Sequence, residues 1–321
     1  MQVVFYHTRR LTAYGDGSHA TIPLVDSAVT IGSFDGVHLG HRKIISSMLE
    51  TARRHALRSV VVTFEPHPRL VLDSSGGSPL EVLTTLDEKV VQIADLGVDL
   101  LVVVHFTPEL ATWSSESFAE DLLLGVLSAK SVTVGYDHGF GRNRSGSGKT
   151  LAELGAISGF DVQVIDELRV DGEHVSSTRI RKLLKCGQIA EANRFLGVPY
   201  VVSGTVVEGR KLGRELGFPT VNLTPSDPQK LLPRDGVYIA AVSIDGAQYR
   251  AMMNICNRPT VSEQAVRTVE AHIIGYSGSL YGRTLRFSLF GFVRDERKFS
   301  SVDELQLQLE KDKKTVELFF E

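Results

Sequence analysis

Residues 29–47 constrain the fold more than any other stretch, because they join a buried strand to a helix through a glycine-rich turn. Val29-Thr30-Ile31 is a β-branched run that predicts a buried strand. Three glycines follow by position 40, and apolar residues then recur at helical spacing from Ile44 to Leu49. This order of elements forms a phosphate-receiving turn, because unpaired N–H groups and the positive end of the helix dipole point at the ligand.

The rest of the first half alternates continuous apolar runs with amphipathic segments. The runs are typical of strands that are buried on both faces of a parallel sheet. We expect strands over residues 59–64, 99–104, 131–134 and 161–165, and helices over 87–96 (with Asp87 as the N-cap), 115–124 and 151–157. Strands that alternate with helices predict an α/β domain of the Rossmann-like type with a doubly wound parallel sheet, which binds ligands at the carboxyl ends of its strands.

Two histidines stand at the start of the first predicted helix. His38 and His41 are three residues apart, so their imidazoles share one helix face, and Gly40 between them leaves room for a nucleotide. Imidazole N–H donors placed there suit nucleotidyl transfer, because charge gathers on the α-phosphate oxygens in the transition state. The alternatives are an ordinary surface helix and a zinc site completed by His67, although no fourth ligand is evident.

The pattern changes near residue 200, where short strands follow one another without helices. Strands are expected over residues 200–207, 236–242, 249–254, 269–274 and 284–290, with a closing amphipathic helix over 302–318. These features predict a small antiparallel β-barrel. The predicted domains are therefore residues 1–186 and 200–321, joined by a linker over 187–199.

The barrel carries a second glycine-rich stretch, residues 209–223, whose flexible backbone and cations suit a di- or triphosphate. Thr220 and Asn222 are two residues apart, so they face one side of a strand and offer the neutral oxygen ligands that Mg²⁺ accepts. Glu270 lies on the polar face of a later strand, opposite its apolar neighbours. On its own, a glutamate at such a position is usually just solvated.

Four segments resemble the bacterial bifunctional riboflavin kinase/FAD synthetase family. The family's G-x-F-D-G-x-H-x-G-H, G-x-D-F-x-F-G, I-S-S-T-x-I-R and G-x-L-G-F-P-T-x-N patterns occur in this order, with His138 where phenylalanine is usual and Val175 where isoleucine is usual. The residues that carry the first pattern are Gly32, Phe34, Asp35, Gly36, His38, Gly40 and His41. The resemblance covers nearly the whole chain.

The resemblance implies that the C-terminal domain phosphorylates riboflavin with Mg–ATP to give FMN, and that the N-terminal domain adenylylates FMN with a second ATP to give FAD and pyrophosphate. At the adenylyl site it implies that His38 and His41 are catalytic, that ATP contacts Gly32, Phe34, Asp35, Gly40, Asp137, Ser177, Thr178, Arg179 and Arg181, and that His67 and Phe140 face the flavin. At the kinase site it implies phosphate contacts from Gly209, Lys211, Gly213, Gly217 and Pro219, metal ligation by Thr220 and Asn222, and Glu270 as the base.

Composition narrows the choice of partners. The 321 residues carry a formal charge of −3, whereas a general nucleic-acid binder is usually basic. The two cysteines lie far apart and match no zinc or redox spacing. The first residues lack the charged start and apolar core of a signal peptide, and no apolar run reaches membrane-spanning length. We therefore expect a cytoplasmic enzyme with small-molecule substrates, no nucleic-acid or membrane partner, and an oligomeric state that the sequence leaves open.

Three other interpretations compete with this one. Gly148-Lys149-Thr150 suggests a P-loop, but Asn143 stands where the pattern requires glycine. Another H-x-G-H adenylyltransferase, acting for example on pantetheine phosphate or nicotinate mononucleotide, would not need the G-F-P-T-x-N barrel. A flavin-binding regulatory protein that has lost activity would not need intact residues at His38, His41, Thr220, Asn222 and Glu270.

Overall fold

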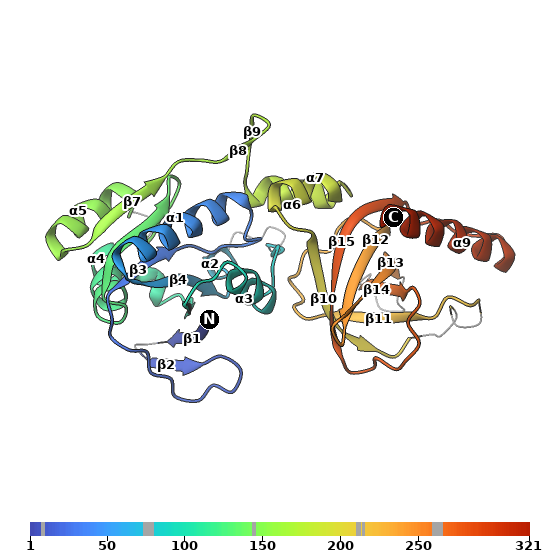
Figure 1. The fold of residues 1–321 in the computed structure, drawn as a ribbon, viewed down its shortest axis with the longest axis horizontal. Helices are drawn as coiled ribbons and strands as arrows, with labels where there is room; N and C mark the ends of the chain where they lie inside the picture. Colours follow the sequence, from blue (N-terminus) through green and yellow to red (C-terminus); the bar gives the residue numbers. More distant parts are fainter. Residues whose placement is uncertain (8–9, 73–79, 143–145, 210–212, 214–215, 259–265) are drawn as a thin grey trace. The chain divides into compact units, whose positions relative to one another are not determined.

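The computed structural model describes residues 1–7, 10–72, 80–142, 146–209, 213, 216–258 and 266–321. Contacts divide the chain into two units, Met1–Ser176 and Ser177–Glu321 (Figure 1). Lys211, a predicted phosphate ligand, lies outside the described residues. No helix among the described residues has the length and apolar character needed to cross a membrane.

The first unit is built on a seven-stranded sheet in the order β2-β1-β5-β4-β3-β6-β7. All neighbouring strands are parallel except β1 and β2, which are antiparallel at one edge. The strands are β1 (Gln2–His7), β2 (Arg10–Ala13), β3 (Ser27–Ile31), β4 (Arg58–Glu65), β5 (Leu100–His105), β6 (Ala129–Gly135) and β7 (Asp161–Ile165), followed by the hairpin β8 (Arg169–Val170) and β9 (Glu173–His174). The predicted doubly wound parallel sheet is confirmed, and β1 and β2 extend it beyond the prediction.

Helices cover both faces of this sheet. The helical segments are α1 (Leu39–His55), α2 (Pro68–Leu72), α3 (Leu86–Ala94), η1 (Leu110–Thr112), α4 (Ser115–Phe118), η2 (Ala119–Leu124) and α5 (Gly148–Ser158). Alternate strand residues enter two separate cores: Val61 packs with Ile45 of α1 and Ile93 of α3, whereas Val60 shares a core with Leu122 of η2 and Leu151 of α5. Burial on both faces explains why the central strands are continuously apolar.

Local sequence sets the helix ends. Thr85, rather than the predicted Asp87, is the N-cap of α3; its hydroxyl accepts from Glu88 N while the Glu88 carboxylate accepts from Thr85 N, which is a capping box. The predicted helix over residues 115–124 changes to a π-helix at Ala119. α1 ends at Ala56, which has a left-handed backbone.

The second unit is a closed six-stranded antiparallel barrel in the order β10-β11-β14-β13-β12-β15, and the last strand pairs with the first (Figure 1). Its elements are α6 (Ser177–Lys185), α7 (Ile189–Leu196), β10 (Tyr200–Val207), β11 (Thr220–Pro225), β12 (Gly236–Ile244), β13 (Ala247–Arg258), β14 (Val266–Ile273), β15 (Thr284–Arg294) and α9 (Val302–Phe319). Asp245 and Gly246 turn β12 into β13 with positive φ angles, as their residue types favour. The predicted barrel and closing helix are confirmed.

Helix α9 is fixed to the outside of the barrel. Val316 packs with Met252 of β13 and Ile239 of β12. The Arg294 guanidinium donates from Nε to both carboxylate oxygens of Asp312, at 3.1 and 2.9 Å, and Asp312 is only 2% exposed. A buried carboxylate needs such a partner, so this ion pair ties β15 to α9.

Candidate active sites

The strand order of the first unit reverses beside β3, since the chain leaves β3 toward β4 and β5 and later returns on the other side as β6. In open α/β sheets such a switch point, at the carboxyl ends of the strands, is where ligands bind. The predicted residues of the first signature lie at this point, in the β3–α1 loop (residues 32–38) and the first turn of α1. The segment after β6 contributes Asp137, which is exposed, and Phe140, which is buried.

His38 is the N-cap of α1, and its Nδ1 accepts a hydrogen bond of 3.3 Å from His41 N. The neutral His38 ring therefore carries its hydrogen on Nε2. The two rings are stacked, with centroids 3.6 Å apart and planes at 15°, and Phe34 meets His41 edge-on at 5.3 Å. The structure thus brings both predicted catalytic histidines together at the helix N-terminus.

Two glycines leave space for the aromatic rings at this helix start. A Cβ on Gly40 would lie 3.2 Å from both Cε1 and Nδ1 of His38, and a Cβ on Gly32 would lie 3.1 Å from the Phe34 ring. Phe34 itself is 2% exposed and has a φ of 46°, a left-handed conformation that a bulky residue rarely adopts. Gly40 and Gly32 therefore make room for protein rings as well as for any ligand.

Asp35 faces inward. Its Oδ1 accepts from Leu83 N at 2.8 Å and from Thr84 N at 3.0 Å, and the Thr84 hydroxyl accepts from Gly36 N at 3.0 Å. These bonds join the β3–α1 loop to the segment that leads into α3, 48 residues further along the chain. The observed partners of Asp35 support the shape of the loop, and its contact with ATP stays a prediction.

The charge state of His41 follows from its surroundings. Burial, then the neighbouring His38 and the Lys89 ammonium, hold the pKa of His41 well below the usual histidine range. Its Nδ1 is shielded from solvent and has no hydrogen-bond partner among the described residues. An uncharged His41 is consequently the form present near neutral pH.

Aromatic side chains gather near the carboxyl ends of β4 and β6. Phe118 lies between Phe64 and Phe140, with ring centroids 6.4 and 6.0 Å away. His138 lies nearly parallel to Phe140, at 5.7 Å and 18°, so the histidine that replaces the family's phenylalanine keeps an aromatic ring there. His67, after the cis Glu65–Pro66 bond, accepts from Arg69 N at its Nδ1.

The four predicted ATP contacts of the I-S-S-T-x-I-R segment begin α6. These residues, Ser177, Thr178, Arg179 and Arg181, belong to the second unit. There the Arg179 guanidinium lies 4.9 Å from the centre of the Phe195 ring of α7. Their contribution to the adenylyl site stays a prediction.

The barrel aligns the predicted kinase residues on neighbouring strands. Asn222 of β11 pairs with Glu270 of β14, which in turn pairs with Asn254 of β13. Residues opposite one another share a face, so these three side chains form one row. Val269 and Ala271 are buried on the other face, as the alternation predicts. Asn254 Oδ1 is shielded from solvent and has no hydrogen-bond partner among the described residues.

Two described glycines of the glycine-rich stretch lie close to other residues, Gly209 to Asn222 of this row and Gly213 to Phe218. A Cβ on Gly209 would lie 2.0 Å from Asn222 Nδ2, and one on Gly213 would lie 2.3 Å from Phe218 O. Gly217 has a φ of 79°. Next to the row, His272 Nδ1 donates to Pro219 O at 2.8 Å and fixes the entry to Thr220, which is exposed. Burial holds the pKa of His272 below its ordinary value, although the bond to Pro219 opposes this.

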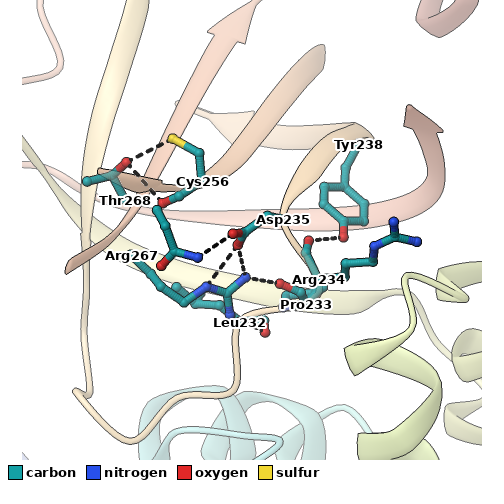
Figure 2. Close-up of polar contacts among 9 residues, drawn as sticks. Leu232, Pro233, Arg234, Asp235, Tyr238, Cys256, Arg267 and Thr268 are labelled. Carbon is teal, nitrogen blue, oxygen red and sulfur yellow. Dashed lines mark hydrogen bonds and ion pairs between the residues drawn. The ribbon is translucent and has the colours of Figure 1, made fainter. Parts of the chain in front are cut away.

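Arg267, on the same strand as Glu270, fastens β14 to the loop before β12. Figure 2 shows its guanidinium beside Asp235, with Nε 3.1 Å from the carboxylate, while Nη1 donates to Leu232 O at 2.8 Å and Nη2 to Pro233 O. Cys256 Sγ lies 3.2 Å from the Thr268 hydroxyl in the same cluster. The strand that carries Glu270 is therefore held at its start.

Sequence reasoning assigned no role to two residues that the structure brings to these sites. Lys89, near the β3–α1 loop, is only 3% exposed. A lysine on an amphipathic helix is usually exposed to solvent, so no sequence pattern indicated this burial. Asn254 joins the kinase residues because it pairs with Glu270 across β13 and β14, and this register cannot be read from the sequence. The T-x-x-E pattern of Thr85 and Glu88 was a visible signal for the start of α3.

Comparison with known proteins agrees with this division. The FAD synthetase family model matches residues 23–179, and the riboflavin kinase model matches residues 196–320. A bifunctional riboflavin kinase/FMN adenylyltransferase from Listeria monocytogenes is 34% identical over 92% of this chain and 93% of its own length. The enzyme of the same name from Escherichia coli K12 is 36% identical over 93% of this chain and 94% of its own length.

A solved structure agrees over the full length. The crystal structure of a protein from Streptococcus pneumoniae, described as a macrolide-efflux protein, has a TM-score of 0.87 and 27% identity, and covers 99% of both chains. Both domain models match in the order predicted from the sequence, and the relatives align over nearly their whole length. The chain therefore belongs to the bifunctional riboflavin kinase/FMN adenylyltransferase family, with the adenylyltransferase domain first and the kinase domain second.

Proposed function

We propose that His38 and His41 carry the adenylyl transfer. An oxygen of the FMN phosphate attacks the α-phosphorus of ATP, and the bond to the β-phosphate oxygen breaks to release pyrophosphate. The Nε2–H of His38 and the uncharged ring of His41 donate to the α-phosphate oxygens as charge gathers there. The stacked pair at the N-terminus of α1 is the observation that supports this assignment.

At the flavin side of the same site, the rings of Phe64, Phe118 and Phe140 offer an apolar wall to the isoalloxazine. His67 follows the carboxyl end of the same strand, β4 (Arg58–Glu65). Gly32, Asp137 and the start of α6 bind ATP in this proposal, as the family pattern implies. The domain boundaries at 1–186, 187–199 and 200–321 belong to the same proposal, which the matches to residues 23–179 and 196–320 support.

In the barrel, Glu270 takes the proton from the 5′-hydroxyl of riboflavin while the oxygen attacks the γ-phosphorus of ATP, giving FMN and ADP. Thr220 and Asn222 offer a hydroxyl and a carboxamide oxygen on one strand face, which fits a Mg²⁺ ion that also binds phosphates. When bound, this ion would neutralise phosphate charge. The register Asn222–Glu270–Asn254 supports the assignment, because Glu270 lies between Asn222, the proposed metal ligand, and Asn254. Asn254 Oδ1 has no hydrogen-bond partner among the described residues, so it is available to accept from a flavin hydroxyl in this proposal.

One paired assay tests both assignments. The wild-type protein is incubated with riboflavin and Mg–ATP, and FMN and then FAD are followed by chromatography. His41→Ala should accumulate FMN, with FAD formation reduced about a hundredfold or more. Glu270→Gln should lose riboflavin phosphorylation by about a hundred- to ten-thousandfold and still convert supplied FMN to FAD. Normal FAD formation by His41→Ala, or normal phosphorylation by a folded Glu270→Gln, refutes the respective role.

A further inference from the structure

Lys89 is a buried cation that the reaction described above does not use. It lies on α3, is 3% exposed, and donates from Nζ to the Thr63 hydroxyl at 3.3 Å, the hydrogen bond it makes within the described part of the chain. A neutral hydroxyl satisfies only part of an ammonium group. Burial lowers the pKa of Lys89, and the charges of Asp35 and Glu65 oppose this only in part. A methionine at this position would avoid the desolvation cost of a buried charge, so the presence of the lysine suggests a role for its charge.

The hydrogen bonds of Lys89 lead to the β3–α1 loop. Thr63, on β4, is fully buried, and its hydroxyl donates to Ser33 O at 3.1 Å. The hydrogen bonds Lys89–Thr63–Ser33 form a relay from α3 through β4 to the β3–α1 loop. Asp35, in the same loop, accepts from the backbone amides of the segment before α3. The loop that leads into the catalytic histidines is thus held twice by α3 and the residues before it.

The same ammonium acts on the charge of His41. The groups that influence the His41 ring are His38, stacked on it, and Lys89; Phe34 packs at its edge and is uncharged. The acidic groups that face Lys89 are Asp35 and Glu65. Without the ammonium, one of the two charged or titratable neighbours that hold the pKa of His41 low would be lost, so the protonated form of His41 would become easier to reach.

We propose that Lys89 is a positioning residue for adenylyl transfer, which fixes the β3–α1 loop through Thr63 and keeps His41 as an uncharged hydrogen-bond donor. This inference rests on the proposed role of His41. An uncharged ring donates to the α-phosphate oxygens without the tight ground-state binding of the triphosphate that an imidazolium would add, and binding that is already present in the ground state does not speed the chemical step.

The test separates the two effects with three variants. Lys89→Met removes the charge and the relay, Lys89→Arg keeps a charge, and Thr63→Val breaks only the relay. The ring protons of His41 are titrated by NMR in the substrate-free protein, with His41→Ala to assign them, and FAD formation from FMN is measured between about pH 6 and 9. Riboflavin phosphorylation and a melting curve serve as controls.

Lys89→Met should raise the pKa of His41 and reduce FAD formation about tenfold or more near pH 6, with a smaller loss at high pH. Lys89→Arg should keep the wild-type titration. Thr63→Val should slow FAD formation at every pH without moving the titration. The kinase rate should not change in any variant. Lys89→Gln provides a second uncharged variant if Lys89→Met does not fold.

An unchanged His41 titration in the uncharged variants, or pH–rate profiles that superimpose on the wild type, would overturn the role of Lys89. The NMR titration does not depend on turnover. A shifted titration combined with normal FAD formation by His41→Ala would instead refute the proposed role of His41 and leave the coupling between Lys89 and His41 standing.

Discussion

Gly209→Ala provides a sharp test of the kinase site, because the structure predicts which atoms it displaces. An alanine Cβ at this position would lie 2.0 Å from Asn222 Nδ2, 2.5 Å from Cγ and 2.8 Å from Oδ1. Ordinary contact begins near 3.4 Å, so the carboxamide must retreat by roughly 1.4 Å. The obstructing atoms end a short, rotatable side chain, so the barrel can stay folded while Asn222 leaves its place beside Glu270.

The energetic consequences differ for folding and for catalysis. Overpacking of this kind typically costs about 1 to 3 kcal/mol of unfolding free energy, and the lower backbone entropy of an unfolded alanine offsets about 0.4 to 1 kcal/mol. A displacement of about 1 Å in a group that positions substrate can reduce turnover about a hundredfold. We therefore expect a large loss of riboflavin phosphorylation with a small change in stability.

The assay compares phosphorylation rates, FAD formation from FMN, and melting curves. Gly291→Ala is a matched control in the same barrel, since its Cβ would meet only the flexible end of Ile239 at 3.3 Å. The double variant Gly209→Ala/Asn222→Ala completes a cycle: if the glycine acts through Asn222, the double variant should be no slower than Asn222→Ala alone. Normal phosphorylation by a folded Gly209→Ala, or additive losses in the cycle, would refute the reasoning.

Four further outcomes are expected. Asn222→Ala should raise the Mg²⁺ concentration for half-maximal kinase activity about tenfold or more, and an unchanged midpoint and rate would reduce this residue to a turn former. Gly40→Ala should displace the His38 ring, 3.2 Å from the new Cβ, and slow FAD formation about 10- to 100-fold while phosphorylation continues; equal rates would show that the ring adapts. Arg267→Met should lower the unfolding free energy of the barrel by about 1 to 3 kcal/mol in urea, because backbone carbonyls and a carboxylate lose their donor. Because the folded pKa of His41 lies below its unfolded value of about 6.5, the unfolded state binds more protons below that pH; the wild type should lose stability on acidification there, and His41→Gln should lose less.

Local patterns predicted most of the elements. Continuous apolar runs located β4 and β5, and an amphipathic pattern located α9. Strand β1 was missed because its partner, β5, lies almost a hundred residues away, and a short apolar run at a chain end has no flanking signal. The register of the barrel shows that Asn222 and Glu270 are neighbours, a pairing that alternation within each strand alone could not predict.

The roles of site residues could not be predicted from the sequence where they depend on partners far away along the chain. Asp35 fits a ligand-binding pattern, yet its Oδ1 accepts hydrogen bonds from backbone amides 48 and 49 residues away. Lys89 resembles a solvated helix charge until tertiary packing places it beneath the β3–α1 loop. Both cases depend on contacts between segments that the sequence does not order in space.

The closure of the barrel also dictates when the kinase domain can form. The first strand, β10, pairs with β15, whose residues are synthesised 79 to 89 positions later, from Thr205↔Thr284 to Tyr200↔Leu289. The sheet of the first unit is complete at residue 165, so it can fold while the barrel strands are still being made. Pairings this distant in sequence fold slowly. A ribosome-bound chain should therefore acquire its adenylyltransferase domain first, and a chain truncated before β15 should keep that domain and leave β10 and β12 with unpaired, aggregation-prone edges.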